Sequence, residues 1–258
     1  MLKRWIGAAV AIVLLAGCAT RPTDPEALAA YQANNDPLEP FNRSIFAFNQ
    51  GADRYVIGPV VSGYRTVVPK SVREGVDNFS KNLKQPIYLI NALLQADFKA
   101  AGQITGRFVI NTVFGFFGVF DTAGANDIPF VKRDFGQTLA VWGLKDGGPY
   151  IMLPLLGPTT IRDAVGMGVD AFADPVDWAL YETEPALAWG RFGLDGLVAM
   201  DNTKDLKENM QKNSTDYYAT MRSMYQQNRR KEIGVLRGET EEVRESYDFD
   251  FPDDEEEE

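Results

Sequence analysis

The chain has 258 residues and a formal net charge of −10, and it contains one cysteine and no histidine. Without histidine it has no Ser-His-Asp or Cys-His catalytic machinery, no histidine-ligated zinc and no access to the commonest general base of enzymes. A single cysteine excludes an internal disulfide, so the fold has to rest on its packed core.

The N-terminal residues have the pattern of an export signal that ends at the cysteine. Lys3 and Arg4 form a basic start, and the uncharged, mostly apolar run 5–16 follows. This run is shorter than the roughly 20 apolar residues that a transmembrane helix needs. The sequence Leu-Ala-Gly-Cys then ends at Cys18 and resembles the lipobox of bacterial lipoproteins. We therefore predict a signal peptide over 1–17; the alternative is an ordinary secretory signal with a chance cysteine.

Cys18 is the predicted site of lipid attachment. The lipobox resemblance implies a covalent diacylglycerol and an N-acyl chain on this residue. Two or more acyl chains make a membrane anchor stable, because each buried CH2 contributes about 0.8 kcal/mol. By analogy with the sorting of such lipoproteins, Ala19 after the cysteine indicates release to the outer membrane.

Three regions follow the predicted signal peptide. Residues 18–35 are predicted to be a lipidated tether, 36–232 a single helical body and 233–258 an acidic tail. Residues 239–258 hold twelve acidic residues and one arginine, which leaves the body with almost no net charge. A segment with that much like charge repels itself and buries nothing, so we predict that the tail is disordered.

The body is predicted to be mainly helical, because apolar residues recur at helical spacing along most of it. Asp36 and Pro37 have the pattern of an N-cap followed by the first helical position. The helix behind them carries Phe41 and Phe48 on one apolar stripe. Further helices are predicted from about residue 69 to 83 and over 85–113, 160–173, 185–200, 203–212 and 214–231.

Residues 113–120 do not have the composition of ordinary core. They combine four phenylalanines with two glycines, and their centre is Phe114-Gly115-Phe116-Phe117-Gly118. The segment is too short to span a bilayer, but such a turn at a helix end can dip into one leaflet or line a cavity. A buried turn between two core helices is an equally good interpretation. The Gly-x-x-Gly spacing has no neighbouring cations and therefore does not indicate nucleic-acid binding.

The second unusual segment is 147–158, which is apolar and contains three prolines. Three prolines exclude a continuous helix or a central strand, so we predict an extended stretch that wraps other elements or lines a wall. Tyr150, Leu153 and Leu155 are its candidate contact residues. One of the two threonines that follow is expected to cap the next helix.

Familiar catalytic motifs do not occur in the sequence. It has neither the G-x-S-x-G elbow of lipases nor a Walker A motif for nucleotide-driven transport. Asp134-Phe135-Gly136 spells part of a kinase signature, but the glycine-rich phosphate loop is missing and the kinase catalytic loop needs a histidine. A carboxylate pair for glycoside chemistry depends on spatial geometry, and nothing in the sequence indicates one. We predict a protein that is not an enzyme and binds no cofactor or metal.

Four motifs resemble the MlaA (VacJ) lipoprotein family, and they appear in the family's order across nearly the whole body. They are Asp-Pro-Leu-Glu-Pro-Phe-Asn-Arg at 36–43, Arg107-Phe108 with Asn111-Thr112, Asp-Phe-Gly-Gln-Thr-Leu at 134–139, and Gly148-Pro149-Tyr150 through Leu156-Gly157-Pro158. The resemblance implies an all-α single domain whose amphipathic helices form a ring around an amphipathic channel, embedded in the inner leaflet of the outer membrane. Phe117 departs from the family pattern, since relatives often have a second glycine there.

The resemblance also implies a function. Members of the family remove mislocalised phospholipids from the outer leaflet, associate with a trimeric porin and pass the lipid to an MlaC-like periplasmic carrier, which maintains lipid asymmetry. The alternatives are a structural lipoprotein that organises porins without moving lipid, and a lipid hydrolase. Candidate channel-lining or membrane-contacting residues are Phe41, Phe48, Phe114, Gly115, Phe116, Phe117, Gly118, Tyr150, Leu153 and Leu155.

Overall fold

The computed structural model describes residues 36–238, and these are mainly helical, as predicted. The predicted signal peptide, the lipid-attachment residue Cys18, the tether and residues 239–258 lie outside the described residues. The elements in chain order are α3 (Glu39–Ala52), the π-helical η1 (Asp53–Ile57), α4 (Gly58–Val67), α5 (Lys70–Leu83), α6 (Gln85–Leu94), α7 (Phe98–Val113), α8 (Thr122–Ala125), α9 (Phe135–Val141), β1 (Tyr150–Leu153), β2 (Gly157–Thr160), α10 (Ile161–Ala173), α11 (Pro175–Thr183), α12 (Pro185–Asn213) and α13 (Tyr217–Arg237).

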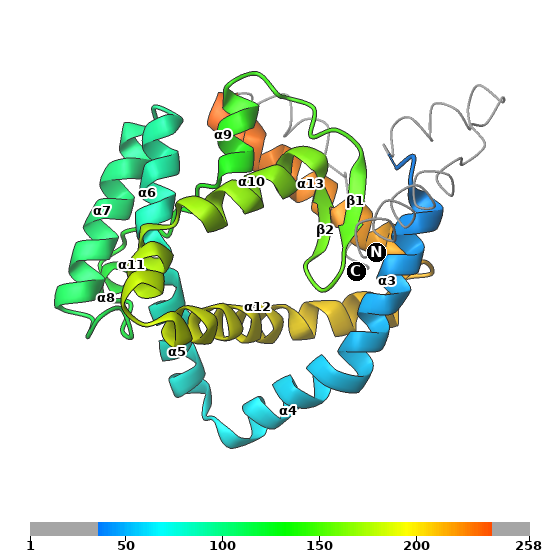
Figure 1. Cartoon of the computed structure of the whole chain (residues 1–258), viewed down its shortest axis with the longest axis horizontal. Helices are drawn as coiled ribbons and strands as arrows, with labels where there is room; N and C mark the ends of the chain where they lie inside the picture. The colour runs from blue at the N-terminus through cyan, green and yellow to red at the C-terminus, as the bar shows by residue number, and fades with distance from the viewer. Residues whose placement is uncertain (1–35, 239–258) are drawn as a thin grey trace, which may run out of the picture.

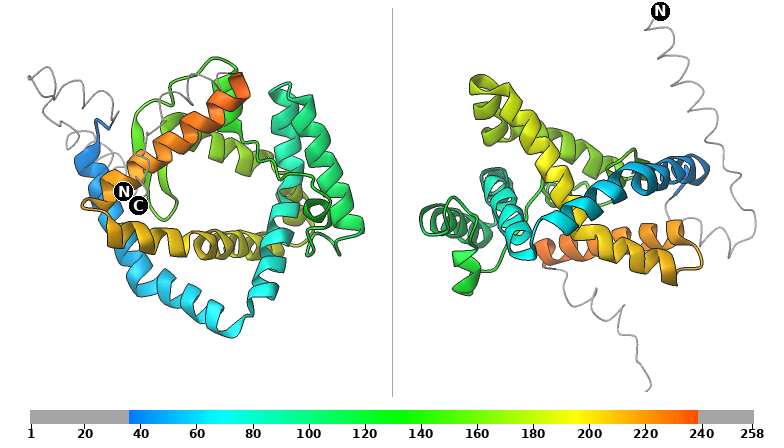
Figure 2. Two further views of the ribbon diagram at one scale, coloured as in Figure 1. Left: turned by 180° about the vertical axis from the view of Figure 1, so that it is seen from behind. Right: turned by 90° about the horizontal axis from the view of Figure 1, so that it is seen from below.

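The helices follow one another around a ring (Figure 1). α3, η1 and α4 form one side, α5 continues from the corner, and α6 and α7 pack together on the opposite side. α9, α10, the β-hairpin and α13 close the ring, and α12 crosses it. Seen from below, α11 and the first turns of α12 project from one side of the ring (Figure 2, right). The predicted ring of helices is therefore confirmed.

Two predicted helix boundaries are wrong because of aspartates. The predicted helix 85–113 is two helices, α6 and α7, since Asp97 caps α7 by accepting a hydrogen bond from the backbone N of Ala100 at 2.9 Å. A capped N-terminus competes with continuation of the preceding helix. The reverse error occurs in α12, which is one helix of 29 residues where two were predicted. Its Asp201 binds arginines from other helices and therefore does not interrupt the backbone.

Other differences concern additional helices and the ends of predicted ones. The structure adds α4, α8, α9 and α11, which were not predicted. Asp174 caps α11 by accepting from the backbone N of Val176 at 2.9 Å. α13 continues to Arg237, so the start of the predicted tail, 233–237, is helical. Asp36 is not an N-cap, because α3 begins at Glu39 and Asp36 is a buried ion-pair partner.

The proline-rich segment forms an antiparallel hairpin in which Tyr150 pairs with Thr160. α3 covers the other edge of β1 with two asparagines. Asn42 donates to the carbonyl of Tyr150 at 3.1 Å and accepts from the backbone N of Met152 at 2.9 Å. Asn49 donates to the carbonyl of Leu153 at 2.9 Å. These side chains satisfy backbone groups that a third strand would otherwise bind, so the hairpin is fixed to the ring.

The apolar core is small and divided. One cluster consists of Phe46, Tyr150, Met152 and Tyr218, between α3, β1 and α13. The other consists of Ala92, Ala100, Ala101 and Ile104, between α6 and α7. No helix among residues 36–238 is both long and apolar enough to cross a membrane.

Candidate lipid-binding surface

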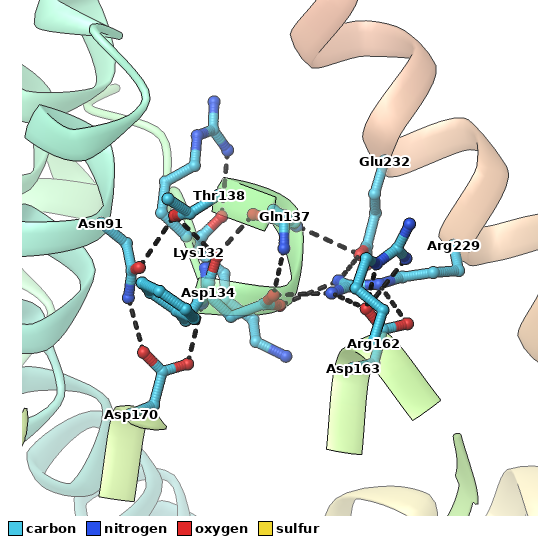
Figure 3. A network of polar contacts seen from close by, with 12 residues as sticks. Asn91, Lys132, Asp134, Gln137, Thr138, Arg162, Asp163, Asp170, Arg229 and Glu232 are labelled. Atoms are coloured by element: carbon cyan, nitrogen blue, oxygen red, sulfur yellow. Dashed lines mark hydrogen bonds and ion pairs between the residues drawn. The ribbon is translucent and has the colours of Figure 1, made fainter. Parts of the chain in front are cut away.

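Charged side chains occupy the interior of the ring wall. Arg229 on α13 forms ion pairs with Asp134 at the start of α9 (2.6 Å) and with Asp163 on α10 (2.9 Å), as Figure 3 shows. We call these three residues the Arg229 cluster. Burial alone would raise the pKa of Asp163, but the hydrogen bonds and charge of Arg229 outweigh it and lower the pKa to about 2. Ionised groups therefore join three elements that are distant in sequence.

Two more buried arginines join distant elements in the same way. Arg222 on α13 pairs with Asp36 at 2.8 Å, and the hydroxyl of Tyr218 donates to the same carboxylate. Arg191 on α12 pairs with Asp174, the cap of α11, at 2.6 Å. Buried ion pairs add little net stability, but loss of one partner leaves a charge that is costly to bury. These buried ion pairs therefore determine which helices pack against one another.

Large apolar side chains lie mostly on the outside. Among residues 36–238, thirty-two are exposed, whereas only fourteen apolar residues, six of them alanine, are buried. Trp142, Trp178 and Trp189 are each more than half exposed. Because water-soluble proteins rarely expose large contiguous apolar surface, this distribution indicates contact with a membrane or a partner.

The phenylalanine turn, residues 114–120, is the most concentrated part of this exterior. Phe114, Phe116 and Phe117 are 73%, 68% and 65% exposed, so the interpretation as a buried turn is wrong. Phe116 and Phe117 have φ angles of 52° and 57°, in the left-handed region that bulky residues avoid. The backbone is strained in the conformation that presents these two rings outward.

The base of the turn is polar and closely packed. Asn82 on α5 donates to the carbonyl of Phe117 at 3.2 Å. A Cβ at Gly115 would collide with the carbonyl of Phe120, and a Cβ at Gly118, where φ is 97°, would collide with Asn82. Both glycines are buried, so they shape the turn and do not contact the surroundings. The prediction that Gly115 and Gly118 are contact residues is therefore wrong.

Two further apolar stretches were not predicted. Phe98, Val109 and Val113 are exposed on one face of α7, which leads into the phenylalanine turn. At the projecting end, Phe172 stacks edge-to-face on Trp178 of α11 with 5.8 Å between ring centroids. Aromatic residues at helical spacing were the signal in the sequence, but the same pattern is typical of ordinary core helices.

Tyr150 is misassigned as a contact residue. It is fully buried, and its ring lies edge-to-face against Tyr218. Alternate residues of a strand point to opposite faces, and in β1 the inward face includes Tyr150 and Met152. Contact with lipid stays a prediction for the others in this group, which are at least partly exposed: Phe41, Phe48, Leu153 and Leu155.

The fold and this surface define a class of protein: a ring of helices with ionised groups inside its wall and aromatic groups outside. Among residues 36–238, no cluster of three or more His, Cys, Asp or Glu side chains could hold a metal ion. The model of the MlaA lipoprotein family matches residues 34–232, and the chain belongs to this family.

Two relatives and one solved structure make the comparison specific. The chain is 33% identical over 230 residues to the intermembrane phospholipid transport system lipoprotein MlaA of Escherichia coli (strain K12), which covers 87% of this chain and 86% of that protein. The protein of the same name from Haemophilus influenzae is 34% identical over 229 residues, with 88% of each chain covered. A structure solved under the heading "Structural basis for maintenance of bacterial outer membrane lipid asymmetry" matches with a TM-score of 0.64 at 33% identity, and covers 75% of this chain and 96% of that chain.

Proposed function

We propose that this protein is an outer-membrane lipoprotein that removes mislocalised phospholipids from the outer leaflet and passes them to a periplasmic carrier. Membership of the MlaA family supports the proposal, as do the relatives' names, which assign those proteins to an intermembrane phospholipid transport system. Retrograde transport of this kind maintains the lipid asymmetry of the outer membrane.

The observation that carries the proposal is the distribution of side chains: ionised groups lie inside the ring wall, and large apolar groups lie outside it. A phospholipid with two long acyl chains has roughly 30 CH2 groups, so exposing both chains to water costs on the order of 20 kcal/mol or more. A protein without a nucleotide-binding motif can only lower this barrier, by offering a continuous apolar path. Exposed aromatic side chains of the phenylalanine turn and α7 supply apolar contact for the acyl chains.

The proposal extends to anchoring and partners. Acyl chains on Cys18 hold the protein at the inner leaflet, and the phenylalanine turn dips into that leaflet. A trimeric porin is the proposed partner within the membrane, and an MlaC-like protein is the proposed acceptor of the lipid. The proposal includes no catalytic step, since the chain has no histidine and no lipase motif.

Lipid capture by the purified protein distinguishes transport from the alternatives. Full-length acylated protein would be incubated with phospholipid vesicles and re-isolated, and its bound lipid would be identified by mass spectrometry. We expect intact phospholipid in stoichiometric amounts. Protein that co-purifies with porin but captures no lipid would support a structural lipoprotein, and recovery of lyso-lipid would support a hydrolase.

A further inference from the structure

One face of α5 lies against the backbone of the phenylalanine turn. Gly75, Asn78 and Asn82 share this face, because they recur at spacings of three and four residues along the helix. Asn78 donates to the carbonyl of Val119 at 3.3 Å, and Asn82 donates to the carbonyl of Phe117 at 3.2 Å. A Cβ at Gly75 would lie 3.0 Å from Cγ1 of Val119, so a larger side chain there would push the turn away. Two side-chain amides thus bind the turn to the helix at close range.

The backbone of the turn leaves carbonyl groups for these amides to bind. Four consecutive N–H groups, at 117–120, donate to carbonyls between Thr112 and Phe116. Among residues 36–238, no backbone N–H donates to the carbonyl of Phe117 or of Val119. Asn78 and Asn82 bind these two carbonyls and therefore fix the orientation of the peptide groups that follow Phe117 and Val119.

Asn82 is specialised for this contact. It is 3% exposed, and its Nδ2 donates twice, to the carbonyl of Phe117 and to the hydroxyl of Thr112 in the last turn of α7, at 2.9 Å. Its Oδ1 is buried and has no donor in the part of the chain that the structure describes. A buried polar atom without a partner is uncommon, because it costs free energy. The amide keeps this orientation because the opposite one would place Oδ1 against the carbonyl of Phe117, and two acceptors repel each other.

The turn needs such a contact because its own backbone is strained. Phe116 and Phe117 both adopt the left-handed conformation that large side chains avoid. Strain of this kind persists only where the surrounding structure holds it in place. For this turn, the amides on α5 are part of that surrounding structure, and they act on the backbone without covering the two rings.

We propose that Asn78 and Asn82 are positioning residues for lipid contact, which hold the phenylalanine turn in the strained conformation that presents Phe116 and Phe117 outward. Asn82 has the larger share, since it is buried and also joins the turn to α7. The inference rests on the proposed function, in which this turn contacts lipid. It predicts that loss of the donor at position 82 releases the turn while the ring of helices stays folded.

The variant Asn82→Asp tests this inference, because it keeps the shape of the side chain and makes its donor depend on pH. An ionised carboxylate cannot donate to the carbonyl of Phe117, whereas a protonated carboxyl can. Burial raises the pKa of such a carboxyl. Residues 108–120 carry no charge, and the nearest charged pairs are compensated: Asp77 with Lys81 at 2.6 Å, and Arg107 with Asp121 at 2.6 Å. Burial therefore dominates the pKa at this position.

Hydrogen exchange measures whether the turn is held. Full-length acylated protein would be compared at about pH 5 and about pH 8, on either side of the pKa expected for a buried carboxyl. The readout is the protection factor of residues 117–120, which removes the intrinsic dependence of exchange on pH. Asn228→Asp, the same exchange at an exposed position of α13, is the matched control. Asn78→Ala, at a half-buried position, is a milder second variant.

We expect Asn82→Asp to lose about tenfold in the protection of 117–120 at the higher pH and to regain it at the lower pH. Asn78→Ala should lose about threefold at both, and the wild type and the control should not change. Capture of phospholipid from vesicles of phosphatidylethanolamine and phosphatidylglycerol, relative to the wild type at the same pH, should follow the protection of the turn. A side chain that only fills space would show no recovery in acid.

Unchanged protection in Asn82→Asp, or a loss that acid does not reverse, would overturn the inference. A released turn that captures lipid as the wild type does would overturn it as well. If Asn82→Asp lost protection along the whole chain, Asn78→Ala would decide, and an unchanged turn in that variant would count against the inference. All these outcomes leave lipid capture by the wild type standing, whereas a wild-type protein that captures no lipid would contradict the proposed function itself.

Discussion

The Arg229 cluster and the phenylalanine turn differ in what they bury. The cluster buries ionised groups and pairs them, with Arg229 held between Asp134 and Asp163. The turn exposes aromatic rings on a strained backbone, with Phe116 and Phe117 in the left-handed region. A protein selected only to fold in water would place these groups the other way round. The difference separates two tasks: the interior holds the ring together, and the exterior is the surface that we propose for lipid contact.

The largest predicted effect is on the interior. Arg229→Met leaves the buried carboxylate of Asp134 without its cation and leaves Asp163 with Arg162 alone, at 2.8 Å, and we expect a loss of about 3–5 kcal/mol in the free energy of unfolding. Urea unfolding would measure it. The matched control is the exposed neighbour Arg230→Met, for which a change within about 0.5 kcal/mol is expected. Equal effects of the two substitutions would contradict a structural role for the Arg229 cluster.

The same cluster predicts how stability depends on pH. The folded-state pKa of Asp163 is lowered from 3.8 to about 2, since the bonds from Arg229 outweigh the effect of burial. A lowered pKa contributes stability that is fully present above the unfolded value and is lost as the pH falls through the folded value. We expect a loss on the order of 2 kcal/mol between about pH 4 and pH 2. Asp163→Asn should flatten this part of the curve, and an equally steep curve in that variant would contradict the assignment.

A smaller effect of opposite sign is predicted for the phenylalanine turn. Phe117→Gly relieves a left-handed conformation, so the variant should be more stable by up to about 1 kcal/mol. Phe114→Gly is the control, because Phe114 is equally exposed but has a φ of −102°. The same urea unfolding applies to both. Loss of stability in Phe117→Gly would mean that the ring supports the fold and is not held outward at a cost.

The smallest expected change in stability accompanies a loss of function. Phe116→Asp/Phe117→Asp places two charges at exposed positions and should change the free energy of unfolding by no more than about 0.5 kcal/mol. Lipid removal should nevertheless fail, because the turn can no longer enter an apolar phase. Leu206→Asp on α12 is a control outside the turn, at an exposed apolar position. Intact lipid removal in the double variant would exclude the turn as a lipid contact.

The sequence predicted the helical class and most helix positions, because apolar spacing is a local property. It did not predict the ion pairs, since Arg229 and Asp134 are 95 positions apart and only the fold brings them together. The local pattern of Asp36 predicts a helix cap, whereas its actual partner, Arg222, is 186 positions away in the sequence.

The phenylalanine turn was ambiguous in the sequence for a related reason. Four phenylalanines fit a buried turn and an exposed one equally well, and only the burial of Gly115 and Gly118 against α7 and α5 directs the rings outward. The sequence does not show which face of the strand Tyr150 occupies, because that depends on the register of the hairpin.

Lipid removal is tested by measuring the phospholipid in the outer leaflet of cells that lack this protein, with a surface-active phospholipase as the reporter. We predict a rise that the wild-type gene reverses, and that neither Cys18→Ala nor Phe116→Asp/Phe117→Asp reverses. No rise in the deletion strain would contradict lipid removal, and the family fold would then serve a structural role.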